Sequence, residues 1–307
     1  MKRREFVKKS VGAGFVAGTA LAFGSINNLF GKVPLPYSPA DLIAVKGGNP
    51  GQMFDRGIEA LGGIEKFVKP NQTVVVKPNI GWDRSPEQAA NTNPHLLTRI
   101  IEHCLKAGAK EVRVFDHTCD VWTKTYKNSG IEKAVKDAGG KIVPGNTEGY
   151  YHEVDIPKGV KLTSARVHKL ILESDVFINV PVLKHHSSSR LTISMKNLMG
   201  VVWDRRFWHR NNLHQCIADY ATYERKPDLN IVDAYNVMMR NGPQGVSVSD
   251  IVNMKTQILT TDIVAADAAA TRFFGSNPAD VLYIRKANEM GVGEIDLEKL
   301  SIKRIMI

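Results

Sequence analysis

Residues able to bind anions or to exchange protons follow most of the short hydrophobic segments of this 307-residue sequence. They are Lys77 and Asn79 after residues 73–76, Asp116 after 111–115, Lys184 and His186 after 176–180, Asp233 after 229–232, and Asp262 after 256–259. Lysine and asparagine donate hydrogen bonds to carboxylate or phosphate oxygens, and histidine exchanges a proton near neutral pH. These residue types predict a site for a small anionic molecule, provided that the hydrophobic segments bring them together.

The densest group of such residues lies in the segment 183–200, which reads LKHHSSSRLTISMKNLMG. We identify Lys184, His186 and Lys196 as candidate catalytic residues, with His186 as the acid or base and the lysines as contacts for an anion. Apolar residues alternate with the polar ones from residue 191 to residue 198, which indicates a segment held against the protein rather than a free loop.

The candidate ligand contacts are Lys77, Asn79, Asn197, Gly242 and Gly245. The two glycines belong to the loop MRNGPQG at residues 239–245, which matches neither the P-loop nor the dinucleotide-binding fingerprint. A tight turn in which the backbone can approach a ligand is the simpler interpretation of this loop.

Three aspartates, Asp116, Asp233 and Asp262, are candidates for orienting the histidine or for holding a divalent cation. Oxygen ligands would favour magnesium, calcium or manganese over zinc. Each aspartate also has a local alternative, such as the N-cap of the following helix for Asp262 or a turn for Asp116.

Six strands are predicted where β-branched residues cluster, at residues 73–76, 111–115, 141–143, 176–180, 229–232 and 256–259. Helices are predicted between them. The clearest begins at Pro94, with Asn93 as N-cap and Gly108 beyond its end, and others are expected over Ile131–Ala138 and from Asp262 to Phe274.

Strands that alternate with helices favour right-handed crossovers and a mostly parallel, doubly wound (Rossmann-like) α/β sheet with helices on both faces. In such a sheet the residues that follow the strands meet at one edge. We therefore expect the candidate residues to line one cleft at the C-terminal ends of the strands.

The N-terminus has the features of a twin-arginine signal peptide. Residues 2–9 read KRREFVKK, a weakly apolar run extends from Val11 to Phe23, and Ala20-Leu21-Ala22 offers a peptidase site. An uncleaved membrane anchor over Ser10–Gly31 is the alternative, although its glycines and asparagines disfavour insertion.

This pattern predicts three parts of the chain: a signal at residues 1–22, an irregular lead-in at 23–50 and a single α/β domain at 51–307. The expected partner is then the twin-arginine translocase, and the expected location is periplasmic or otherwise extracytoplasmic. Removal of the signal takes away five basic residues and one acidic residue, so the formal charge of +10 would fall to about +6.

This moderate basic surplus suits an anionic small molecule or anionic lipid, whereas the dispersed basic residues argue against nucleic acid. The segment Trp203–Arg210 mixes aromatic and cationic residues. It could be a lid, an interface or a membrane contact, or its aromatics could simply be buried.

The three cysteines are Cys104, Cys119 and Cys216, and no CxxC motif is present. The chain therefore encodes neither a zinc ribbon nor an iron–sulfur cluster. Buried thiols are favoured over the alternative, a bridge between Cys104 and Cys119.

Several motifs together resemble the uncharacterised family named domain of unknown function 362. They are VKPN at 76–79, AGAKEVRVFD at 107–116, SDVFINVPVLKHH at 174–186, MKNLMG at 195–200 and the Gly-Pro-x-Gly loop. The resemblance maps the family's motif residues onto Lys77, Asn79, Asp116, Lys184, His186, Lys196, Asn197, Asp233, Gly242, Gly245, Asp262 and Asp267. Many members resemble fusions to a ferredoxin-type domain, and this chain departs from them because it lacks the cysteines.

The resemblance implies no particular reaction, so function is inferred from the residues. We expect an exported enzyme that binds a small carboxylate or phosphate, with a divalent metal as an additional expectation. A non-catalytic protein that captures an anion or a metal is the first alternative. A redox protein with a cofactor is the second.

Overall fold

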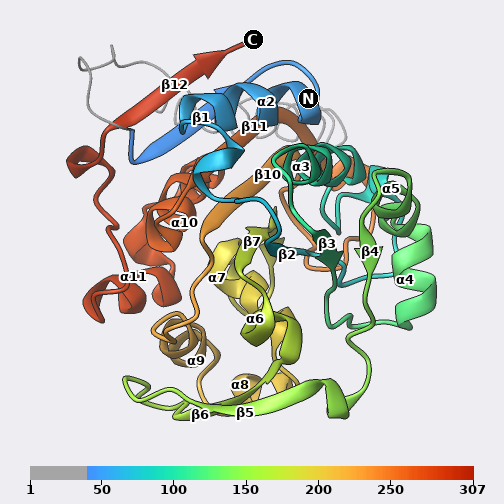
Figure 1. Ribbon diagram of the computed structural model, residues 1–307. Helices are drawn as coiled ribbons and strands as arrows, with labels where there is room; N and C mark the ends of the chain where they lie inside the picture. The colour runs from blue at the N-terminus through green and yellow to red at the C-terminus, as the bar shows by residue number, and fades with distance from the viewer. Residues whose placement is uncertain (1–39) are drawn as a thin grey trace, which may run out of the picture.

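The computed structural model describes residues 40–307, and the expected signal at 1–22 and most of the expected lead-in lie outside the described residues. The protein has an α/β fold built on a ten-stranded, mostly parallel sheet (Figure 1). Eight strands follow one another in the order β12-β1-β11-β10-β7-β2-β3-β4, while β8 pairs with β10 and β9 pairs with β8. The strands β5 and β6 form a separate two-stranded ribbon.

The strands are β1 (Leu42–Lys46), β2 (Thr73–Pro78), β3 (Glu111–Val114), β4 (Lys141–Ile142), β5 (Tyr151–Asp155), β6 (Ser164–His168), β7 (Val176–Val180), β8 (Val182–His186), β9 (Arg190–Thr192), β10 (Leu229–Met238), β11 (Ile251–Thr260) and β12 (Ile302–Met306). The helices are α2 (Pro50–Ala60), α3 (Pro94–Lys106), α4 (Trp122–Asn128), α5 (Ile131–Asp137), α6 (Lys169–Glu173), α7 (Ser194–Asn197), α8 (Arg205–Arg210), α9 (Leu213–Tyr220), α10 (Ile263–Thr271) and α11 (Leu282–Glu289).

The polarity of the strands decides which candidate residues can meet. β2, β3, β4, β7, β8 and β10 run parallel to one another, so residues at their C-terminal ends lie at the same edge of the sheet. β11 runs antiparallel to β10 and to β1. The prediction that Asp262 shares an edge with the other candidates is therefore wrong, because Asp262 follows β11 at the opposite edge.

Hydrophobic side chains pack on both faces of the sheet, as expected for a doubly wound fold. Val74 and Val76 of β2 point into one core with helices α2, α3 and α5. Val75 points into the other core, which contains side chains of α9, α10 and α11. The alternation follows from the two-residue period of a strand and explains why these strands are hydrophobic throughout.

The predicted helix boundaries near Pro94 are confirmed. Asn93 caps α3, and its side chain accepts a hydrogen bond from the amide of His95. The expectation of irregular structure up to Pro50 is wrong for Leu42–Lys46, which forms β1 between β11 and β12. Among the described residues, no helix is long and apolar enough to cross a membrane.

Candidate functional site

A buried ion pair joins the ends of β2 and β3. Nζ of Lys77 lies 2.9 Å from Oδ1 of Asp116, and the side chains are only 1% and 3% exposed. Oδ2 of Asp116 accepts a hydrogen bond from the amide of Ile80 at 2.6 Å. No described group donates a well-aligned hydrogen bond to Oδ1, so this oxygen interacts with Lys77 through charge. Burial lowers the pKa of Lys77, and the neighbouring carboxylate of Asp116 opposes that shift.

Two asparagines connect this ion pair to a second buried lysine. Nζ of Lys77 donates to Oδ1 of Asn197 at 2.9 Å, and the same oxygen accepts from Nδ2 of Asn79 at 3.0 Å. Oδ1 of Asn79 in turn accepts from Nζ of Lys184 at 3.2 Å. Residues at the ends of β2 and β3, on α7 and on β8 thus form one continuous network, which we call the lysine–asparagine network: Lys77, Asn79, Asp116, Lys184 and Asn197.

Lys184 differs from Lys77 because no carboxylate pairs with it among the described residues. Its Nζ donates to the backbone carbonyl of Ala90 at 2.5 Å and to Asn79, and the residue is 1% exposed. Burial lowers the pKa of Lys184 to about 7. The amine can therefore accept or donate a proton near neutral pH.

Lys196 lies beside this network and is partly buried. Its ammonium makes no hydrogen bond or ion pair with the described part of the chain. Burial first, and then the neighbouring cations Arg205 and Lys77, lower the pKa of Lys196 to about 8. Asp116 is the one carboxylate among the groups that most strongly affect Lys184 and Lys196, so positive charge is in excess here.

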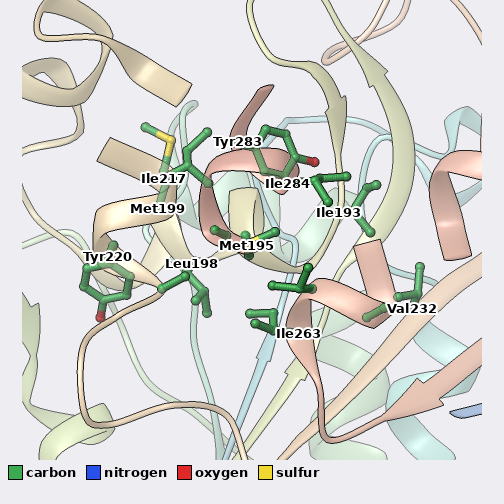
Figure 2. Close-up of a cluster of buried hydrophobic side chains, with 14 of the residues drawn as sticks. Ile193, Met195, Leu198, Met199, Ile217, Tyr220, Val232, Ile263, Tyr283 and Ile284 are labelled. Atoms are coloured by element: carbon green, nitrogen blue, oxygen red, sulfur yellow. The ribbon is translucent and has the colours of Figure 1, made fainter. Parts of the chain in front are cut away.

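The short helix α7, which carries Lys196 and Asn197, is held in place from two sides. Figure 2 shows Met195 and the following Leu198 among side chains of α9, α10 and α11, such as Ile217 and Ile263. The carboxylate of Asp267, on α10, accepts the backbone amides of Ser194 at 2.7 Å and Met195 at 3.1 Å. The apolar residues of segment 191–198 thus anchor the polar residues between them, as the sequence pattern predicted.

Gly200 allows the backbone to approach the ion pair. A Cβ atom at this position would lie 1.8 Å from Oδ1 of Asp116 and 2.6 Å from Nζ of Lys77. The backbone of Gly200 also accepts a hydrogen bond from the amide of His117 at 3.0 Å. Only glycine fits at this position, because any side chain would overlap Asp116 or Lys77.

His186 shares the face of β8 with Lys184, but its environment does not suit an acid–base role. Its Nδ1 accepts the amides of Ser188 at 3.1 Å and Ser189 at 3.3 Å. Burial first, and then the charges of Lys196 and Lys184, lower the pKa of His186 to about 2. The ring is therefore neutral at neutral pH, which argues against the acid–base role predicted for His186.

The rim beside the network is formed by the loop after β3 and by α8. The ring of His117 stacks on Trp203, with centroids 5.0 Å apart and planes 4° apart. Arg205 donates to the carbonyls of His117 at 2.6 Å and Thr118 at 2.7 Å, and its guanidinium lies 3.5 Å from the exposed thiol of Cys119. In the predicted Trp203–Arg210 patch, Arg205 thus points inward rather than into solvent.

The family model described as Domain of unknown function (DUF362) matches residues 74–272 of this chain. The match extends from β2 to the end of α10 and includes every residue of the lysine–asparagine network. The chain belongs to the DUF362 family. The resemblance found in the sequence motifs is thereby confirmed.

Three proteins are similar to this DUF362 chain. A thylakoid-associated protein of Synechocystis sp. is 24% identical over 243 residues, which cover 76% of this chain and 73% of the relative. The lactate racemase apoprotein of Thermoanaerobacterium thermosaccharolyticum matches with a TM-score of 0.43 and 14% identity, over 73% of this chain and 55% of that one. A Thermotoga maritima protein matches with a TM-score of 0.47 and 12% identity, over 79% of this chain and 59% of that one.

The three aspartates predicted to hold a metal do not come together. Asp233 accepts the amides of Asn93 and Tyr235, and Asp262 caps α10 through the amides of Val264 and Ala265. No group of three or more histidine, cysteine, aspartate or glutamate residues within residues 40–307 could hold a metal ion. The residues therefore do not fit the expected divalent cation, and the local alternative for Asp262 is confirmed.

The two loop glycines have packing roles. A Cβ at Gly242 would lie 2.0 Å from the carbonyl of His185, and a Cβ at Gly245, where φ is +79°, would lie 2.7 Å from Met238. The amide of Gly242 also donates to Nδ1 of His185 at 3.1 Å. The loop thus lies against the backbone of β8, in agreement with a tight turn, and the ligand contact expected of these glycines is not part of the network.

The cysteines are all free, so the alternative bridge between Cys104 and Cys119 is wrong. Cys104 and Cys216 are buried as expected, but Cys119 is exposed.

The sequence analysis did not identify Asn179, Gly200 or Arg205 as residues of the site. Asn179 is buried on β7 and accepts from Nδ2 of Asn197 at 2.9 Å, and its position within a hydrophobic strand was the available signal.

Proposed function

We propose that this protein is an enzyme that binds a small carboxylate or phosphate at the ends of β2, β3 and β8, and that Lys184 exchanges a proton with the bound molecule. The observation that carries the proposal is the position of Lys184. Its amine is buried, has no carboxylate partner among the described residues, and is linked through Asn79 to the rest of the network.

A buried lysine without a counter-ion is costly to a fold, because the ammonium loses its hydration. Proteins seldom keep such a group for stability alone, and strongly perturbed titratable groups concentrate at functional sites. The lowered pKa of Lys184, near 7, suits a general acid or base at neutral pH.

Lys196 would bind the anion beside this amine, while Asn197, whose amide already donates to Lys77 and Asn179, would hold the network in place. The ammonium of Lys196 has no hydrogen-bond or ion-pair partner among the described residues. Because Asp267 and the core fix α7, this binding group is preorganised. This support from Asp267 and the core distinguishes Lys196 from a solvated lysine on the protein surface.

The first test measures binding. Cys119 is exposed, lies against Arg205 and interacts electrostatically with Lys77, Lys184 and Lys196, so its alkylation rate reports an anion bound nearby. A panel of acetate, pyruvate, inorganic phosphate and glycerol phosphate should contain at least one compound that protects Cys119. Lys184→Met should abolish the protection, while Lys133→Met, at an exposed site on α5, should keep it.

The second test separates an enzyme from a binding protein. A bound compound incubated in deuterium oxide should acquire deuterium, or be converted, in the presence of the wild type and not of Lys184→Met, as followed by proton NMR. Protection of Cys119 without exchange or turnover would favour the non-catalytic binding protein. A panel in which no compound protects Cys119 would remove the proposed site.

We also propose that the protein is exported by the twin-arginine route and works outside the cytoplasm. The sequence Lys2-Arg3-Arg4 with the weakly apolar run after it supports this proposal. Replacement of Arg3 and Arg4 by lysine should retain the full-length chain in the cytoplasmic fraction. The reverse change, replacement of Lys8 and Lys9 by arginine, should leave export unchanged.

A further inference from the structure

The hairpin of β8 and β9 presents a polar face that the network uses only in part. Lys184 pairs with Thr192, and His186 pairs with Arg190, in antiparallel register. Directly paired residues place their side chains on the same face of a sheet, and so do residues two apart on one strand. Lys184, His186 and Thr192 therefore share one face, while Leu183 and Leu191 point into the core on the other.

Thr192 carries an unused hydroxyl on this face. The residue is 3% exposed, and its Oγ1 has no hydrogen-bond partner among the described residues. Buried hydroxyl groups nearly always have partners, and an unpaired one costs free energy. Because Thr192 lies beside Lys184 on this face, its hydroxyl is free to donate to a ligand bound there.

His186 contributes a second unused donor. Because the amides of Ser188 and Ser189 both point at Nδ1, the proton of the neutral ring resides on Nε2. No described group accepts a hydrogen bond from Nε2. The ring is thus fixed as a neutral N–H donor, which suits an acceptor oxygen rather than a metal ion or a cation.

Lys196 provides the third donor and the charge. It lies on α7, which directly follows β9, and its charge acts on both Lys184 and His186. Asp116 is already paired with Lys77, so the charges of Lys196 and Arg205 remain unbalanced. A ligand with two negative charges would balance them.

We propose that Thr192, His186 and Lys196 form a subsite for a dianionic tetrahedral oxyanion, the phosphate group of a small phosphorylated molecule or free phosphate. The proposal rests on the anion site proposed above and specifies its ligand. The three donors come from three elements, β9, β8 and α7, and a phosphate group offers several oxygens that can each accept a hydrogen bond. A planar monocarboxylate would leave at least one donor and one positive charge unmatched.

The test compares inorganic phosphate, glycerol phosphate and acetate by isothermal titration calorimetry with the full chain. It is run at about pH 7.5, where phosphate monoesters are dianionic. Either phosphate compound should bind at least tenfold more tightly than acetate. Tighter binding of glycerol phosphate than of inorganic phosphate would identify a phosphorylated molecule, and equal binding would identify free phosphate as sufficient.

Two variants test the donors separately. Thr192→Val removes the hydroxyl at nearly constant shape and should weaken phosphate binding by roughly tenfold to a hundredfold, the range expected for a hydrogen bond to a charged group. Its thermal stability should not fall, since the hydroxyl has no partner in the protein. His186→Asn keeps an acceptor for the two serine amides, removes the Nε2 donor, and should have a similar effect.

Ser174→Ala is the matched control. Its hydroxyl is also buried and unpartnered among the described residues, but Ser174 precedes β7 and lies at the opposite edge of the sheet. Phosphate affinity should be unchanged in this variant. Acetate binding as tight as phosphate binding, or an unaltered phosphate affinity in Thr192→Val, would overturn the subsite and leave the general anion site standing. Absence of binding by these three compounds and by pyruvate would overturn both.

Discussion

Nζ of Lys77 and Oδ1 of Asp116 face each other at 2.9 Å, in a part of the protein where neither side chain is more than 3% exposed. Asp116→Asn should leave the ammonium of Lys77 buried without a counter-ion and should reduce the free energy of unfolding by about 3–5 kcal/mol. Urea denaturation measures this change.

The exposed pair between Lys133 and Asp137 on α5 is the control for that experiment. Asp137→Asn should cost less than about 1 kcal/mol, because water screens an exposed pair. The double variant Lys77→Met/Asp116→Leu should recover part of the loss by removing both charges. An equal loss in the buried and the exposed variants would contradict the importance of burial.

Gly200 gives a second prediction about the same ion pair. Gly200→Ala should push Asp116 away from Lys77, since the added Cβ would overlap Oδ1, and should destabilise the protein by about 1–3 kcal/mol or more. Gly149→Ala is the matched control, because nothing lies within 4 Å of a Cβ at that position. Thermal denaturation of the two variants should differ clearly, and similar midpoints would refute the steric argument.

The sequence was sufficient to predict the mostly parallel sheet and the edge at which Lys77, Asp116 and Lys184 meet. Each of these residues directly follows or ends a run of β-branched residues, and parallel strands bring such ends together. The N-cap of α3 was equally accessible, because Asn93 and Pro94 form a local signal.

The position of Asp262 could not be predicted in the same way. A hydrophobic run reads alike in either direction, so the sequence did not reveal that β11 is antiparallel. The direction is set by the connection from β10, which returns through residues 239–250 without a crossover helix.

The protonation of His186 was also beyond the sequence. A histidine between two lysines is a reasonable acid–base candidate, yet burial and the amides of Ser188 and Ser189 determine its state. The role of Asp267 depends in the same way on a contact between α10 and α7, about seventy positions apart in the chain.

That contact yields a prediction about binding. Asp267→Asn replaces one acceptor oxygen by an amide, which cannot accept from both Ser194 and Met195, so α7 should lose part of its anchorage. We expect phosphate affinity to fall and the free energy of unfolding to decrease by about 1–3 kcal/mol. Asp262→Ser, which retains an N-cap at the opposite edge of the sheet, should leave the affinity unchanged.

The last prediction concerns pH and Lys184. Burial lowers the pKa of Lys184 from 10.5 to about 7, so between these values the unfolded chain binds a proton that the folded protein does not. This group therefore makes the folded state more stable as pH rises from about 7 towards 10, by an amount on the order of 4 kcal/mol. Lys184→Met lacks this contribution. The stability of the wild type relative to the variant should therefore increase as pH rises from about 7 towards 10, as measured by urea denaturation at each pH. Lys133→Met, which removes an exposed ammonium, should follow the pH dependence of the wild type. A wild type whose stability relative to Lys184→Met is constant from pH 7 to 10 would show that Lys184 stays protonated in the folded protein, and the amine could not then serve as the base.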